Sequence, residues 1–100
     1  MFDDYREIDI EEALDIVKSN ISEPALYEQL AEECSELSQA ALKKARKLRN
    51  ENPTPKEMDD IDSSVSEEVG DVILCLSVLD LDYDSELFCR KLVRWINRTL

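Results

Sequence analysis

The sequence of 100 residues has no histidine, one glycine and three prolines. Without histidine, the chain cannot form a histidine-bound zinc site, the Glu-x-x-His di-iron site of helical bundles, or a histidine general base. Sheets with tight turns need more turn residues than this, whereas long helices tolerate their scarcity. There is also no glycine-rich phosphate loop and no EF-hand spacing. We therefore expect an all-α fold, with any chemistry assisted by a metal and led by carboxylates.

Basic residues and long apolar runs are scarce as well. The net charge is −12, from 24 acidic and 12 basic residues, and such a field repels nucleic-acid phosphates. The longest apolar stretch, residues 72–79, is too short to span a bilayer, and the acidic residues 1–6 do not resemble a signal peptide. We therefore expect neither a nucleic-acid nor a membrane partner.

The three cysteines are an odd number without paired spacing. Cys34, Cys75 and Cys89 have helical, apolar neighbours, which predicts buried, reduced thiols and a cytoplasmic location. A chain of this length predicts one domain covering residues 1–100. Because only 43% of the residues are apolar and 6% aromatic, its core is expected to be thin and to gain from self-association.

Apolar periodicity predicts four helices. Asp9, Ser22 and Asp84 are the expected N-caps of the first, second and fourth, and Thr54 opens a capping box with Pro55 at the first position of the third. A serine-rich segment leaves a break near Ser63 open. A turn is expected at residues 82–84. The predicted helices cover about residues 10–19, 23–49, 55–79 and 85–99.

Two pairs of carboxylates lie at helical spacing. Glu33 and Glu36 are three residues apart, as are Glu68 and Asp71, so each pair projects from one helix face. On a helical wheel the two pairs lie at nearly the same offset from the apolar stripe. Helices joined by a short linker pack antiparallel, which would bring the four side chains to one place. An oxygen-only cage of this kind suits Mg²⁺ or Mn²⁺ rather than zinc.

Three features of the helices are open to two interpretations each. The acidic pairs form either a metal site or a solvated face of a structural bundle. The basic residues 43–49 either complement the dipole at the end of the second helix or take part in substrate binding. Gly70, which is costly inside a helix, either allows close approach of a partner helix or is merely tolerated.

The pattern Glu32-Glu33-x-x-Glu36, a spacer, and Glu68-x-x-Asp71 resembles the EExxE and ExxD motif of the MazG-like, all-α NTP pyrophosphohydrolase superfamily. The resemblance covers residues 26–98, and the segments QLAEECSELSQAALK and SEEVGDVILCLSVL are similar to the family's core helices. It implies a four-helix MazG-like bundle completed by oligomerisation, as a homodimer or homotetramer. It also implies Mg²⁺-dependent hydrolysis of nucleoside triphosphates to a monophosphate and pyrophosphate, with house-cleaning of non-standard nucleotides as one such role.

The resemblance also implies roles for individual residues. Glu32 and Glu36 would be catalytic, with Glu32 holding or activating the attacking water. The implied Mg²⁺ ligands, with Mn²⁺ as an alternative ion, are Glu33, Glu36, Glu68 and Asp71. The implied phosphate-binding residues are Lys91, Arg94 and Arg98.

One position departs from the family pattern, because Trp95 stands where the family has asparagine. Trp95 is open to three roles, as a core residue, an interface residue or a platform for a nucleobase. The departure also keeps an alternative function open, a non-catalytic helical module of the same fold that binds a nucleotide or a protein.

Overall fold

A computed structural model describes residues 4–51 and 55–100, and within these ranges all regular structure is helical, without a strand. The predicted all-α class is therefore confirmed. None of the helices in these ranges has the length and apolar character needed to cross a bilayer. The elements are the short 3-10 helix η1 (Tyr5–Glu7) and the helices α1 (Ile10–Asn20), α2 (Glu23–Arg49), α3 (Met58–Val78) and α4 (Ser85–Thr99).

Three of the helices begin at the caps that the sequence predicts. The side chain of Asp9 accepts a hydrogen bond from the backbone of α1, Ser22 from that of α2, and Asp84 from that of α4. Each cap satisfies one of the N–H groups that a helix start leaves without an intrahelical partner. Local sequence is therefore sufficient to place these three starts.

The start of α3 was predicted wrongly. The helix begins at Met58 rather than Pro55, after Glu57, which makes no side-chain cap; the predicted cap Thr54 lies outside the described residues. The helix begins where its side chains first meet α2, since Lys44 donates to the Met58 sulfur and Ile61 is 1% exposed. Packing rather than capping sets this boundary. The helix also runs without a break through residue 63.

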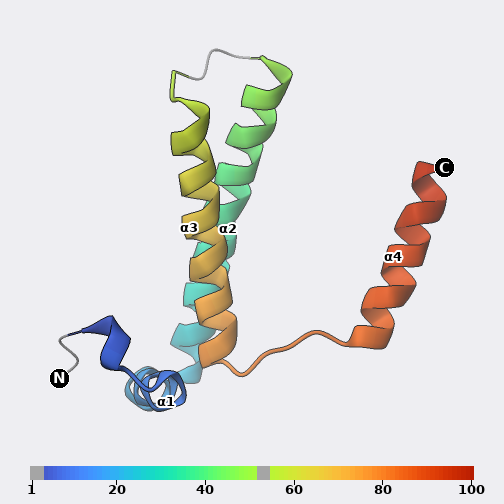
Figure 1. The fold of residues 1–100 in the computed structure, drawn as a ribbon. Coiled ribbons are helices and arrows are strands. Elements are labelled where there is room, and N and C mark those ends of the chain that lie inside the picture. Colours follow the sequence, from blue (N-terminus) through green and yellow to red (C-terminus); the bar gives the residue numbers. More distant parts are fainter. Residues whose placement is uncertain (1–3, 52–54) are drawn as a thin grey trace.

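The helices α2 and α3 form a long antiparallel hairpin, as expected for two helices with a short linker (Figure 1). Near its tip Lys44 pairs with Asp62. At its base α1 packs across α3, where Leu26, Val78 and Leu79 are buried together with the partly buried Leu14 and Leu30. The acidic pairs thus lie on the two helices of one packed hairpin.

The end of α3 directs the chain away from the hairpin. Asp80 adopts a left-handed conformation with φ 56°, and Leu81 N–H donates to the Leu76 carbonyl at 2.9 Å, a Schellman-type ending. The predicted turn at residues 82–84 is wrong, because the chain turns at residues 79–80 and residues 81–84 form no turn. This connector carries α4 to a position apart from the hairpin (Figure 1).

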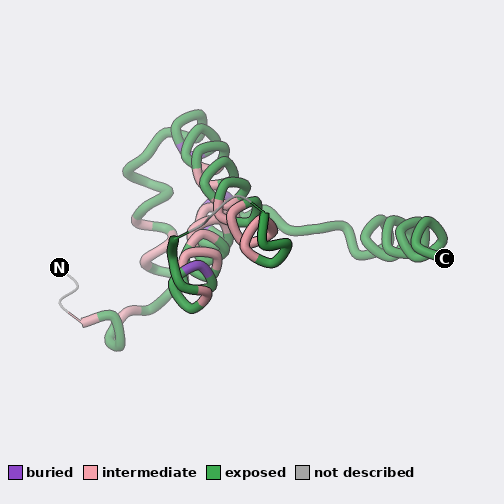
Figure 2. Tube along the Cα trace, turned by 90° about the horizontal axis from the view of Figure 1, so that it is seen from above, coloured by how far each residue is buried: buried purple, intermediate pink, exposed green. Residues whose placement is uncertain are grey.

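Every residue of α4 is exposed (Figure 2). The radius of gyration is 17.4 Å, against about 13 Å for a compact domain of this length. The accessible surface is 8404 Å², against about 5,800 Å² for a folded monomer of this mass. The exposed surface includes large apolar side chains along α4, such as Phe88, Trp95 and Ile96.

The exposure of the single chain decides two points that the sequence left to the fold. The cysteines are free, but the prediction that they are buried is wrong, because Cys34 and Cys89 are exposed and Cys75 only half-buried. Trp95 is 64% exposed, so it does not belong to the core of a single chain. A Cβ atom placed at Gly70 would have no neighbour within 4 Å. Within the described residues, no other helix therefore approaches closely at Gly70.

Candidate metal centre

The hairpin brings the two acidic pairs to one place. Glu33 and Glu36 come from α2, Glu68 and Asp71 from α3, and each offers a carboxylate oxygen such that all four oxygens lie within 4.8 Å of one another. The prediction that the antiparallel pair gathers these four side chains is confirmed. We call these four residues the carboxylate cluster. It offers the oxygen donors that Mg²⁺ and Mn²⁺ prefer over nitrogen or sulfur.

Two oxygens of the carboxylate cluster are buried without a hydrogen-bond partner, Oε2 of Glu33 and Oε2 of Glu68. The other oxygen of Glu33 accepts a hydrogen bond from Gln29 Nε2 at 2.8 Å, which orients the carboxylate on α2. A buried anionic oxygen without a partner is costly, and a bound cation removes that cost. The residues therefore fit a divalent ion.

Mutual repulsion within the carboxylate cluster shifts the titration of Glu36. The negative charge of Glu33 raises the pKa of Glu36 above its ordinary value, and partial desolvation and the charges of Glu68 and Glu32 raise it further. A proton is thus one means of relieving the repulsion. A divalent cation is another, and at neutral pH it relieves more charge.

This shift predicts a pH dependence for the metal-free protein. Since the pKa of Glu36 is higher in the folded state, its contribution to stability is fully present below pH 4.5 and is lost as the pH rises through the raised pKa. We expect Glu36→Gln to be more stable than wild type at pH 7.5, with the difference shrinking toward pH 4.5. Urea unfolding in a chelator at several pH values measures this, and a difference that does not vary with pH would contradict it.

A thiol lies beside the carboxylate cluster but does not contribute a thiolate to it. Burial raises the pKa of the Cys75 thiol, and the charges of Glu33 and Asp71, with a smaller effect of Cys34, raise it further. The ligand atoms that converge within 4.8 Å are four carboxylate oxygens and do not include the Cys75 sulfur. The candidate ligand set therefore consists of hard oxygen donors.

A groove of about 200 Å³ between α2 and α3 opens at the carboxylate cluster and shares Glu36 and Glu68 with it. The sequence interpretation missed this groove. Gln39 and Lys43 lie three and seven residues after Glu36 and therefore share its helix face. This spacing in the sequence could have indicated the α2 side of the groove. The remaining residues that line the groove are Gln39, Ala40, Lys43, Lys56, Ile61 and Ser64.

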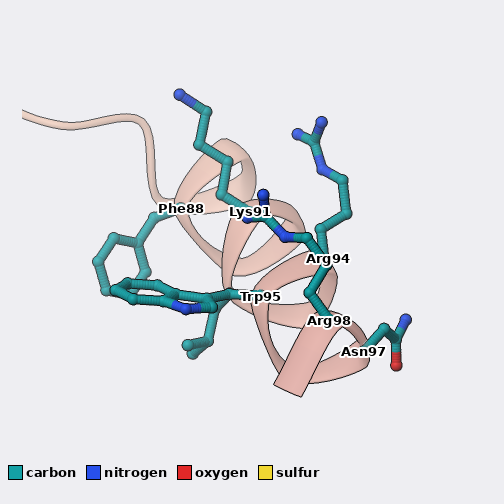
Figure 3. Close-up of a pocket in the computed structure, with 7 residues that line it drawn as sticks. Phe88, Lys91, Arg94, Trp95, Asn97 and Arg98 are labelled. Carbon is teal, nitrogen blue, oxygen red and sulfur yellow. The ribbon is translucent and has the colours of Figure 1, made fainter. Parts of the chain in front are cut away.

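The other predicted site residues lie elsewhere. Glu32 is exposed next to the carboxylate cluster on α2 and acts on it through its charge. Lys91, Arg94 and Arg98 line a separate groove on α4 together with Phe88 and Trp95, and Lys91 and Arg94 extend away from the two aromatic side chains (Figure 3). Within one chain, α4 does not bring these cations to the carboxylates (Figure 1).

Comparisons of the chain with protein-family models, curated proteins and solved structures give no match. The resemblance to the MazG-like superfamily therefore depends on the motif residues themselves.

Proposed function

We propose that the protein is a Mg²⁺-dependent nucleoside triphosphate pyrophosphohydrolase of the MazG-like type, with Mn²⁺ as an alternative ion. One observation carries the proposal. Four carboxylates from two antiparallel helices converge within 4.8 Å, and two of their oxygens are buried without a partner. A solvated acidic face would spread these charges apart, because like charges repel.

In this proposal Glu33, Glu36, Glu68 and Asp71 hold the metal. Bound Mg²⁺ would offset much of the charge of the carboxylates and stabilise charge on the phosphate oxygens. Offsetting this charge is a precondition for substrate entry, because a chain of net charge −12 repels a free nucleotide. Glu32, exposed beside the carboxylate cluster, would orient the attacking water and accept its proton.

We further propose that a second copy of the chain covers α4, giving a homodimer or homotetramer with a completed helical bundle. The helix carries Arg90, Lys91, Arg94 and Arg98 against a single acidic residue, Glu86, whereas the whole chain is strongly acidic. Its charge thus complements the hairpin of another copy. The accessible surface exceeds that of a compact monomer by about 2,600 Å² per chain. Two chains that covered this excess would bury up to about 5,200 Å² in total, at the upper end of the range of obligate interfaces, which is counted over both partners.

A pyrophosphate-release assay over canonical and modified nucleoside triphosphates tests the enzymatic proposal. We expect release that requires Mg²⁺ or Mn²⁺ and stops with a chelator. An absence of turnover across the panel, with metal present, would reject the enzyme. A protein that is stabilised by metal and forms an oligomer but turns nothing over would favour the non-catalytic module, for which the exposed apolar face of α4 supplies a binding surface.

A further inference from the structure

We propose that the groove between α2 and α3 binds the polyphosphate chain of a metal-bound nucleotide, with Lys43 and Lys56 as its anchoring cations. This inference rests on the proposed function only in taking the carboxylate cluster as the place of the metal. It assigns the phosphate contacts to the hairpin that carries the carboxylates, rather than to Lys91, Arg94 and Arg98 on α4.

The groove has the charge distribution that a metal–polyphosphate complex requires. At one end it shares Glu36 and Glu68 with the carboxylate cluster, and at the other end it is lined by Lys43 and Lys56. On α2, Lys43 is seven residues beyond Glu36, so it shares the same face about 10 Å further along the axis. An anion bridging the two ends would meet cations at both.

Lys43 and Lys56 are available for a ligand, unlike their neighbour. Within residues 4–51 and 55–100, neither makes an ion pair, whereas Lys44 pairs with Asp62 across the hairpin. Lys43 is partly buried in the wall of the groove, which lowers the solvent screening of its charge. Lysines at the C-terminal end of a helix stabilise its dipole, but Lys56 lies before the start of α3 and at no helix C-terminus. The helix dipole therefore does not explain its position.

The size of the groove indicates which part of a nucleotide it takes. Its volume of about 200 Å³ is below the roughly 300–1,000 Å³ of pockets for drug-sized ligands. It therefore accommodates linked phosphates and leaves the nucleoside outside. The corresponding ligand class is a polyphosphate with a divalent ion, recognised by its phosphate chain rather than by its base.

Titration calorimetry with inorganic pyrophosphate in the presence of Mg²⁺ tests this site. We expect saturable binding to the wild-type chain and a loss of affinity of at least about tenfold in Lys43→Met with Lys56→Met, since each removes a charge-assisted contact. Lys43→Arg with Lys56→Arg should keep most of the affinity. Lys18→Met, on α1 and outside the groove, removes the same charge and should bind as wild type does.

The outcomes separate this inference from the enzymatic proposal. Pyrophosphate binding without turnover of any nucleotide would reject the enzyme and leave the groove assignment standing. Undiminished pyrophosphate binding by a folded double methionine variant, or no binding by wild type, would overturn the assignment whatever the turnover. Thermal unfolding of each variant establishes that it is folded. If the double methionine variant is not folded, Lys43→Gln with Lys56→Gln replaces it.

Discussion

Asp71→Asn is expected to lower kcat/KM for nucleoside triphosphate hydrolysis by more than about 100-fold, because losses of 10–100-fold are typical even when only a residue behind a metal ligand is changed. Asparagine keeps the shape of the side chain but removes the charge that the carboxylate cluster needs to hold a divalent ion. The measurement is steady-state pyrophosphate release at saturating Mg²⁺.

Asp59→Asn is the matched control for this substitution. Asp59 lies exposed in the first turn of the same helix, α3, and is not part of the carboxylate cluster. Its replacement should change activity little and cost at most about 1 kcal/mol of stability, through the weakened interaction with the helix dipole. If Asp71→Asn hydrolysed the substrate as fast as Asp59→Asn does, the carboxylate cluster would not be the catalytic site.

Leu92→Glu combined with Trp95→Glu is expected to convert an oligomer into a monomer of 11.5 kDa. Both side chains are about half exposed or more in the single chain, at 46% and 64%, so the substitutions remove nothing from its own core. In an interface, however, each introduced carboxylate would be buried without a partner, which is costly. Sedimentation velocity at micromolar concentration gives the mass of each species.

Lys18→Gln serves as a control outside α4. Lys18 is exposed near the end of α1, and the proposal gives it no part in covering α4. Its mass should equal that of wild type. A wild-type chain that sediments as a monomer, or a double variant that stays oligomeric, would contradict the proposal that a second copy covers α4.

Local sequence determined much of the hairpin. Ser22 caps α2, and the bounds of that helix, Glu23–Arg49, coincide with the prediction. The convergence of the carboxylate cluster was also predictable, because three-residue spacing fixes a helix face and a short linker fixes antiparallel packing. Both features depend only on residues close in sequence or on one simple rule of connection.

The sequence-based predictions that proved wrong concern features that depend on contacts between residues distant in the sequence. The start of α3 is set by Met58 and Ile61 packing against α2, which capping residues do not report. The periodicity of α4 correctly predicts a helix with an apolar face, but not what covers that face. For the same reason Cys89 was expected to be buried and is exposed. The groove with Lys43 and Lys56 required the hairpin geometry.

The most direct measurement is the thermal stability of wild type and Glu36→Gln during titration with Mg²⁺ or Mn²⁺ from the metal-free state at pH 7.5. Without metal, the variant should be the more stable of the two, because it lacks the repulsion that raises the pKa of Glu36. With metal, wild type should gain about 2.7 kcal/mol at 100 times Kd and become the more stable protein. A variant that stays more stable at every metal concentration would show that the carboxylate cluster does not bind divalent ions.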